Sequence, residues 1–143
     1  MTDTDSAVDT VVFADTLANN GVDTITGFAL ATDILNWVQG DAETDAAATF
    51  TTSANDLYQL GAQAAGAADS AAAVAAAMNA AATITAAGAT AWIAISDNNS
   101  TSIWAWVDVN GVADEVNVAE ITLVATIDAA MTTAQLATAF TIA

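Results

Sequence analysis

The chain has 143 residues, a length that suits one domain or two very small ones, and 55% of them are apolar, which is enough to bury a core. All 17 charged side chains are Asp or Glu, because Lys, Arg and His are absent, as are Cys and Pro. This composition excludes disulfides, thiolate nucleophiles and imidazole chemistry, and it leaves no cationic side chain to set against nucleic-acid phosphates, so we expect no nucleic-acid partner.

The uncompensated charge predicts a need for cations. A net charge of −17 without counter-charges makes the carboxylates repel one another. Wide spacing, high salt or divalent cations such as Ca²⁺ can each relieve this repulsion, and we expect Ca²⁺ binding helped by wide spacing. The acidic N-terminus does not match a signal peptide, and the least polar run, residues 71–82, is too short to span a membrane, so we expect neither.

The N-terminal third predicts an arm followed by short strands. Residues 1–9 are rich in Asp and Thr and are expected to form a flexible or exchangeable arm that precedes a single β-rich domain, residues 10–143. Turn formers separate short β-prone runs, which predicts strands at 10–13, 23–28 and 33–37. The polar and acidic segment that follows predicts a loop at 40–56 with at most one strand, at 49–52.

An Ala-rich segment predicts a helix at about residues 69–82, with Asp69 or Ser70 as the residue that caps its N-terminus. Val74 and Met78 are four residues apart and therefore share one face. The helix has almost no polar face. It is either buried on both sides, by the sheet and by another element or another copy, or exposed as a surface helix of good helix formers.

The C-terminal half predicts an antiparallel meander. The β-rich runs 90–96 and 102–109 flank a polar loop, 97–101, and a third run, 116–127, follows the turn 110–114. A symmetric loop would place three tryptophans on one face of the hairpin, namely Trp92, Trp104 and Trp106.

A short helix is expected to end the domain. Thr132 and Gln135 have the spacing of a capping box, which predicts a helix that runs to about Phe140. The expected fold class is therefore α+β, with an antiparallel β meander and short N-terminal strands packed with one Ala-rich helix and a short C-terminal helix.

The strongest candidate for a cation site is the turn that follows the second strand of the hairpin. It offers oxygen ligands around Gly111, as Ca²⁺ prefers, from Asp108, Asn110, Asp114 and Glu115. An ordinary β-turn stabilised by Asx hydrogen bonds is the alternative. Weaker candidate ligands are Asp97 and Asn99 in the hairpin loop and Asp23 near the N-terminus.

The tryptophans and the helix predict an assembly interface. Aromatic and apolar side chains are typical of surfaces that bury each other, and the candidates are Trp92, Trp104, Trp106, Val74 and Met78. A carbohydrate-binding platform and core packing between sheet and helix are the alternatives. No pair of carboxylates stands out and no cationic side chain could stabilise an oxyanion, so we do not expect an enzyme.

Two stretches carry a resemblance to a known family: Asn20-Gly21-Val22-Asp23-Thr24-Ile25-Thr26-Gly27-Phe28 and Thr32-Asp33-Ile34-Leu35-Asn36-Trp37. They resemble the NGxDTIxxFxxxTDxLxF pattern that opens the C-terminal domains of RTX-type and surface-layer-type proteins exported by bacterial type I secretion. An Ala-rich helix, a hairpin, a polar turn and a run like 121–124 follow in these domains too, so the likeness covers about residues 9–143.

The resemblance implies an uncleaved C-terminal export signal, export through the type I secretion machinery, Ca²⁺-assisted folding outside the cell, and an extracellular or cell-surface location. Because Met1 opens the chain, we expect the exported domain to be the whole protein. We expect a secreted structural protein that self-assembles as a homopolymer into a filament, sheath or surface layer. The alternatives are a stand-alone type I secretion and folding domain or a carbohydrate-binding adhesion module.

Overall fold

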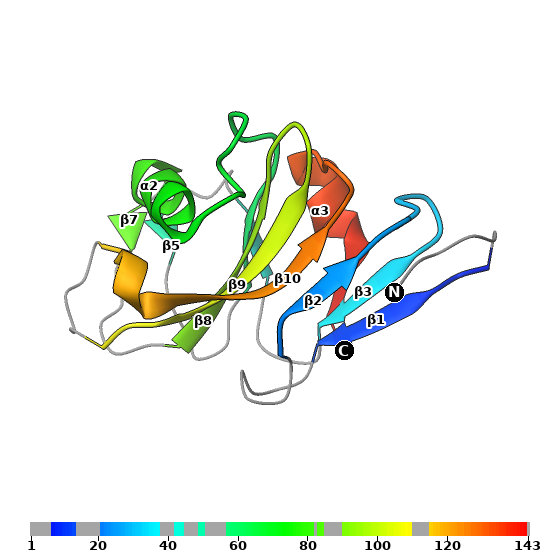
Figure 1. Cartoon of the computed structure of the whole chain (residues 1–143), viewed down its shortest axis with the longest axis horizontal. Coiled ribbons are helices and arrows are strands. Elements are labelled where there is room, and N and C mark those ends of the chain that lie inside the picture. Colours follow the sequence, from blue (N-terminus) through cyan, green and yellow to red (C-terminus); the bar gives the residue numbers. More distant parts are fainter. Residues whose placement is uncertain are drawn as a thin grey trace.

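The computed structural model describes residues 7–13, 21–37, 42–44, 49–50, 57–81, 83–84, 90–109 and 115–142. Within these residues the chain forms an α+β fold, as predicted (Figure 1). In chain order the elements are β1 (Thr10–Phe13), β2 (Asp23–Ile25), β3 (Ile34–Trp37), β4 (Ala42–Thr44), β5 (Thr49–Phe50), β6 (Leu57–Leu60), α2 (Ala71–Ala81), β7 (Thr83–Ile84), β8 (Thr90–Ser96), β9 (Thr101–Val107), the 3-10 helix η1 (Val118–Glu120), β10 (Ile121–Ile127), α3 (Thr133–Ala139) and β11 (Phe140–Ile142).

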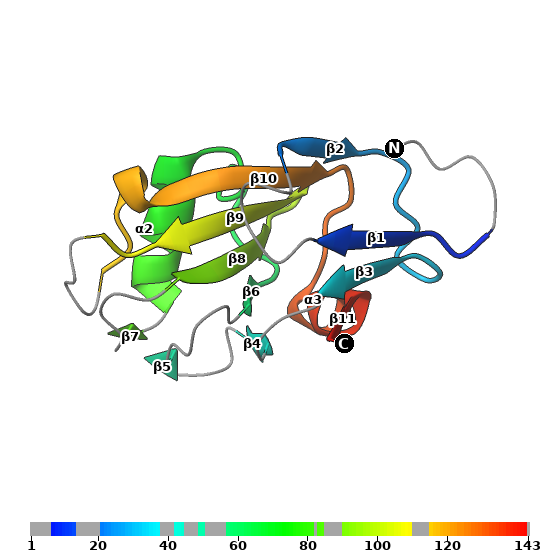
Figure 2. The same cartoon turned by 90° about the horizontal axis from the view of Figure 1, so that it is seen from below.

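The main sheet is built around the predicted meander. Its strand order is β2, β10, β9, β8, β6, β4, and Figure 2 shows these strands in that order. The pairs β8 with β9 and β9 with β10 are antiparallel. Strands β2, β6 and β4 then extend the meander by parallel pairing on its two sides. The main sheet is therefore mixed, with an antiparallel centre and parallel strands on both sides of it.

A second, smaller sheet consists of β1, β3 and β11, and we call it the small parallel sheet. Strand β3 lies in the middle, and both neighbours run parallel to it. Its inward side chains, which include Phe13, Leu35 and Phe140, are buried in the core. The strands β1 and β3 confirm the predictions at 10–13 and 33–37.

Two apolar cores lie on opposite faces of the main sheet. The inter-sheet core fills the space toward the small parallel sheet and α3, and its members include Phe13, Leu35, Leu57, Trp92, Ile103, Val124, Ile127 and Leu136. The helix core lies toward α2, and its members include Tyr58, Leu60, Val74, Met78, Ile93, Ile95, Trp104, Trp106 and Ile121. Both faces of the meander are therefore covered within one chain.

The Ala-rich helix begins and packs largely as predicted. The Ser70 hydroxyl accepts a hydrogen bond from the Ala73 N–H at 3.2 Å, which identifies Ser70 as the capping residue. Val74, Ala75 and Met78 are buried, whereas the face that includes Ala76 is exposed. Alanine therefore serves as a helix former on the exposed side, the second of the two alternatives. Neither helix of the described chain has the length and apolarity of a membrane span.

The hairpin register differs from the prediction by one residue. Ser96 pairs with Thr101, so the loop has four residues rather than five. The Asp97 N–H donates to the Ser100 carbonyl at 3.0 Å and closes this tighter turn. A shift of one residue moves every side chain of a strand to the opposite face. The three tryptophans consequently do not share a face: Trp104 and Trp106 enter the helix core, and Trp92 enters the inter-sheet core.

The C-terminal helix confirms the predicted capping box. The Thr132 hydroxyl accepts from the Gln135 N–H at 3.3 Å, and the Gln135 side chain accepts from the Thr132 N–H at 2.9 Å. The start of this helix packs against the chain that leaves β6. A Cβ atom at Gly61 would overlap the backbone N of Thr133, so only glycine fits at this crossing.

We expect Gly61→Ala to destabilise the protein by about 3 kcal/mol, the upper end of the usual cost of overpacking, because the obstacle is backbone rather than a flexible side chain. Urea denaturation followed by circular dichroism measures this cost. Gly21→Ala is the matched control: Gly21 has a φ of 69° and nothing within 4 Å of an added Cβ, so only the conformational cost of about 1 kcal/mol applies. Equal losses for the two variants would contradict the close approach.

Candidate functional site

Asp97 joins two loops at one end of the β8–β9 hairpin. Its Oδ1 accepts hydrogen bonds from the N–H groups of Asn99 and Ser100 at 2.8 and 3.0 Å. Its Oδ2 accepts from the Gly66 N–H, in the loop before α2, at 2.8 Å. The side chain is 2% exposed, and both oxygens are occupied by backbone donors. Asp97 therefore acts as a turn-forming and loop-joining residue, while Asn99 is exposed beside it.

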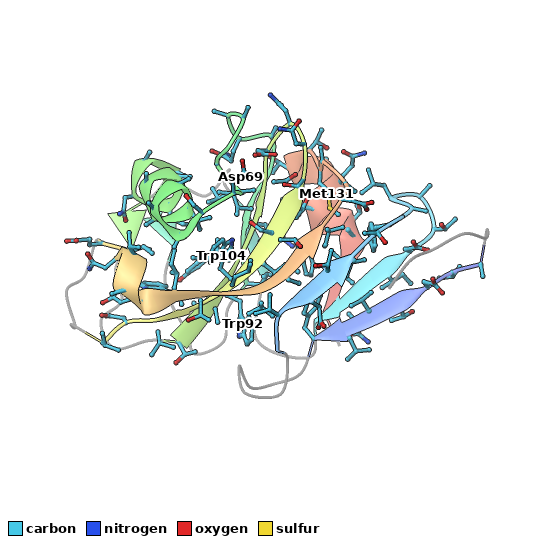
Figure 3. The ribbon with its side chains drawn as sticks, in the orientation of Figure 1. Asp69, Trp92, Trp104 and Met131 are labelled. Atoms are coloured by element: carbon cyan, nitrogen blue, oxygen red, sulfur yellow. The ribbon has the colours of Figure 1, made fainter. Side chains whose placement is uncertain are left out.

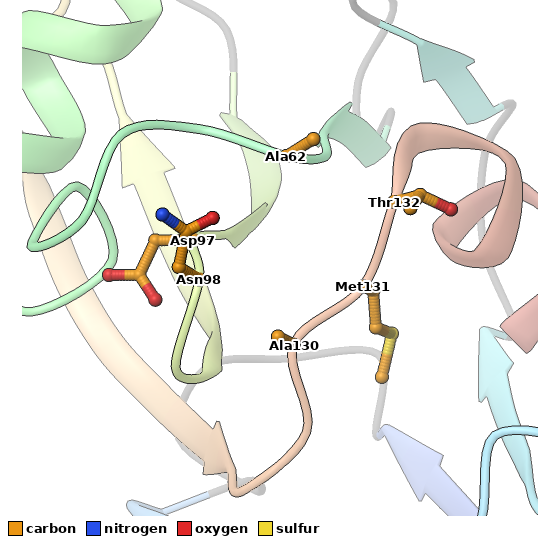
Figure 4. Close-up of a pocket in the computed structure, with 6 residues that line it drawn as sticks. All are labelled: Ala62, Asp97, Asn98, Ala130, Met131 and Thr132. Atoms are coloured by element: carbon orange, nitrogen blue, oxygen red, sulfur yellow. The ribbon is translucent and has the colours of Figure 1, made fainter.

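The backbone donors also set the charge state of Asp97. Burial by itself raises the pKa of this carboxyl, but the N–H groups of Asn99, Ser100, Gly66 and Ala68 outweigh burial and hold the pKa below its ordinary value. An open pocket of about 160 Å³ lies beside it (Figure 4), lined by Ala62, Asp97, Asn98, Ala130, Met131 and Thr132. The lining contains no basic side chain, and its one hydroxyl, that of Thr132, donates to Gln135 at 2.9 Å.

The predicted cation turn is described only at its two ends. Asp108 follows β9 and is buried, and Glu115 is exposed before η1. Asn110 and Asp114 lie outside the described residues. The other candidates are distant: Asp23 pairs with Ala125 in the middle of β10, and Asp97 lies at the opposite end of the hairpin. Within the described ranges no three Asp or Glu side chains form a metal-binding group.

The structure adds a buried acid that the sequence analysis missed. Glu120 is the last residue of η1 and is 5% exposed. Its Oε2 accepts from the Trp106 indole N–H at 3.2 Å and from the Asn117 N–H at 3.1 Å. In the sequence it is a single acid before an apolar strand, where an exposed position is the ordinary expectation. Only the packing of Trp106 reveals its burial.

The residues predicted to form an assembly interface are buried inside one chain. Trp92 belongs to the inter-sheet core, and Trp104, Trp106, Val74 and Met78 belong to the helix core. Figure 3 shows Trp104 on the side of α2 and Trp92 on the other side of the sheet. Core packing, the alternative interpretation, describes all five. A flat carbohydrate platform of three tryptophans is likewise absent from the described surface, because the tryptophans lie on two faces.

An exposed surface remains on the outward face of the small parallel sheet. Strand β1 lies at the lower right margin of the molecule in Figure 1. Val12 is 58% exposed, and Val8, just before the strand, is 61% exposed. Thr10 is exposed as well, and Ile34 and Asn36 are half-buried beside it. No Asp or Glu lies in β1, β3 or β11. The outward face of the small parallel sheet is therefore partly exposed, and its strands carry no charged side chain.

Comparisons with known proteins identify no relative: no family model, no curated protein and no solved structure matches the chain.

The lowered pKa of Asp97 gives a pH prediction. A carboxyl whose pKa is lower in the folded state stabilises the fold above its unfolded pKa, and that contribution is lost as the pH falls through the folded pKa. We expect Asp97→Asn to cost about 2 kcal/mol at pH 7, since hydrogen bonds to a charged group are lost, and to cost progressively less below about pH 4.

Urea denaturation from pH 7 to pH 3 compares the two proteins at each pH, which cancels the effect of acid on the other carboxylates. Asp69→Asn, an exposed acid in the loop before α2, is the control and should change stability by less than about 0.5 kcal/mol. A cost of Asp97→Asn that stays constant with pH would show that the charge of this carboxyl is unimportant.

Proposed function

We propose that this protein is a secreted structural protein that assembles with copies of itself into an extracellular filament, sheath or surface layer, with Ca²⁺ assisting its folding. Contact between copies uses the outward face of the small parallel sheet, not the tryptophans. The single observation that carries this proposal is the exposed, uncharged face formed around Val12 in β1.

The architecture of the small parallel sheet supports the proposal that a second copy covers its outward face. All-parallel sheets are normally covered on both faces, because the crossover connections between their strands place helices there. Here the inward face packs in the core, whereas the outward face exposes Val12 and the neighbouring Thr10. Strand β1 is also the edge of this sheet in the described chain, and uncharged edge strands without proline are ready templates for further pairing.

The charge of the chain favours a second copy at this face over other contacts. Two copies that each carry −17 repel each other wherever carboxylates meet, and no basic side chain can offset the repulsion. A contact formed by strands without Asp or Glu keeps the carboxylates outside the interface. Repulsion between the remaining charges then falls off over the Debye length, about 8 Å at physiological salt.

Export rests on the resemblance of residues 20–37 to type I secretion domains. A chain that folds only outside the cell avoids assembly before export, which suits an extracellular polymer. The alternative of a stand-alone secretion and folding module needs no contact between copies, so the oligomeric state separates the two functions. The carbohydrate-binding alternative loses its basis in the tryptophans, because all three that it requires are buried.

We expect the purified protein to grow into large regular species with increasing concentration in millimolar Ca²⁺, and we expect Val12→Asp to suppress this growth. The new carboxylate would be buried unpaired in the contact, which costs more than the 1.4 kcal/mol equivalent to a tenfold change, so the concentration needed for assembly should rise at least about tenfold. Light scattering and negative-stain electron microscopy measure this.

Ala76→Asp is the control, since Ala76 is also exposed but lies in α2, away from the small parallel sheet. It adds the same charge and should assemble like the parent. A parent protein that stays monomeric at high concentration, with and without Ca²⁺, would favour the secretion module. Equal inhibition by both variants would show that total charge, and not this face, limits assembly.

A further inference from the structure

Glu120 has one carboxylate oxygen without a partner. Trp106 and Asn117 donate to Oε2, whereas Oε1 is inaccessible and has no hydrogen-bond donor in the described part of the chain. A buried carboxylate oxygen that is left unpaired is strongly unfavourable. Most proteins would relieve it with Lys, Arg or His, but this chain contains none of the three. Among the described residues none supplies the missing partner, so a cation from outside the chain is a candidate for it.

A second buried carboxylate lies at the same end of the main sheet. Ile121 pairs with Trp106 at the last position of the β9–β10 ladder. Glu120 precedes Ile121, and Asp108 comes two residues after Trp106, so both acids flank this final pair. Asp108 is 7% exposed. Two buried carboxylates at the same end of a ladder, in a chain without a basic side chain, are candidate ligands for a divalent cation.

We propose that Glu120 Oε1 is a ligand of a divalent cation, Ca²⁺ in an extracellular setting, and that Asp108 is the second carboxylate of this site. Ca²⁺ accepts six to eight oxygen ligands with flexible geometry, so backbone carbonyls and water can complete its shell. The ion ties η1 and the start of β10 to the end of β9. It thereby closes the helix core beside Trp106 and stabilises the folded state over the unfolded chain.

This inference rests on the Ca²⁺ part of the proposed function and specifies its site, but it does not depend on contact between copies. It also differs from the predicted turn site, because the buried Glu120 and not the exposed Glu115 is the decisive ligand. Glu120 and Glu115 therefore make a matched pair of test and control residues for the experiment.

Terbium luminescence tests the site directly, with the full-length protein kept dilute and monomeric. Tb³⁺ occupies Ca²⁺ sites, and the Trp106 indole, which donates to Glu120, should sensitise its emission on excitation of tryptophan. We expect strong emission that Ca²⁺ competes away. Glu120→Gln should abolish the emission, whereas Glu115→Gln should leave at least half of it. Trp106→Phe should weaken the emission but preserve the competition.

Thermal unfolding provides the independent readout. Ca²⁺ should raise the Tm of the parent and of Glu115→Gln relative to EDTA, and it should not raise the Tm of Glu120→Gln. A neutral, protonated Glu120 would instead make the glutamine variant as stable as the parent in EDTA and leave both insensitive to Ca²⁺, which would overturn the proposal. Equal Tb³⁺ emission from Glu120→Gln and the parent would overturn it as well.

Asp108→Asn keeps the proposal testable if Glu120→Gln does not fold. Because one of the two carboxylate ligands is lost, the Ca²⁺ concentration needed to displace Tb³⁺ should rise by about tenfold or more. An unchanged affinity in Asp108→Asn would contradict the site. If the protein folds without Ca²⁺ and still assembles, the cation site is wrong and the assembly proposal stands. If the protein binds Ca²⁺ at this site but stays monomeric, the cation site stands and the assembly proposal is wrong.

Discussion

A chain with 17 carboxylates has no basic side chain to pair with them, so several of its acids, buried or exposed, accept hydrogen bonds from backbone N–H groups. Asp97 joins the hairpin turn to the loop before α2. Asp33 accepts from the Asp9 N–H at 3.1 Å and from the Ala29 N–H at 2.8 Å, and Asp128 accepts from the Gly27 N–H with both oxygens. Each acid thereby connects segments that are distant in the sequence or closes a turn. These carboxylates are structural elements of the fold, whereas Glu120 leaves one buried oxygen without a partner among the described residues, which is the basis of the proposed cation site.

The four-residue hairpin turn made by Asp97 decides where the large side chains go. Because Ser96 pairs with Thr101, Trp92 lies opposite Ala105 and faces the small parallel sheet, while Trp104 lies opposite Ile93 and faces α2. Each face of the meander thus has large apolar side chains that pack against a covering layer, the small parallel sheet on one face and α2 on the other. The same register buries Trp92, Trp104 and Trp106, so the proposed contact between copies uses the outward face of the small parallel sheet instead.

Local chemistry makes about half of this fold predictable. The Ala-rich helix with its Ser70 cap, the capping box before α3 and the three strands of the meander all follow from patterns within a few residues. The predicted register of the β8–β9 hairpin is wrong by one residue, because the length of its loop depends on the turn that the Asp97 side chain stabilises. The strand β6 was missed because Leu57–Leu60 is fully buried and shows no alternation, and its parallel pairing depends on distant partners. At the candidate cation site, the sequence points to Asp108 and Glu115 as acids beside a turn, but the burial of Glu120 depends on the packing of Trp106.

The two proposed roles of cations are physically different. One Ca²⁺ at Glu120 changes the net charge from −17 only to −15, since −17 plus 2 is −15, so it cannot remove the repulsion between copies. It can stabilise the fold by mass action, by about 2.7 kcal/mol at a free concentration 100 times the Kd, because the unfolded chain lacks the site. Repulsion between copies depends instead on screening by all ions present. Under these two proposals, a bound ion favours the folded chain, whereas the lack of Asp and Glu in β1, β3 and β11 lets folded copies meet.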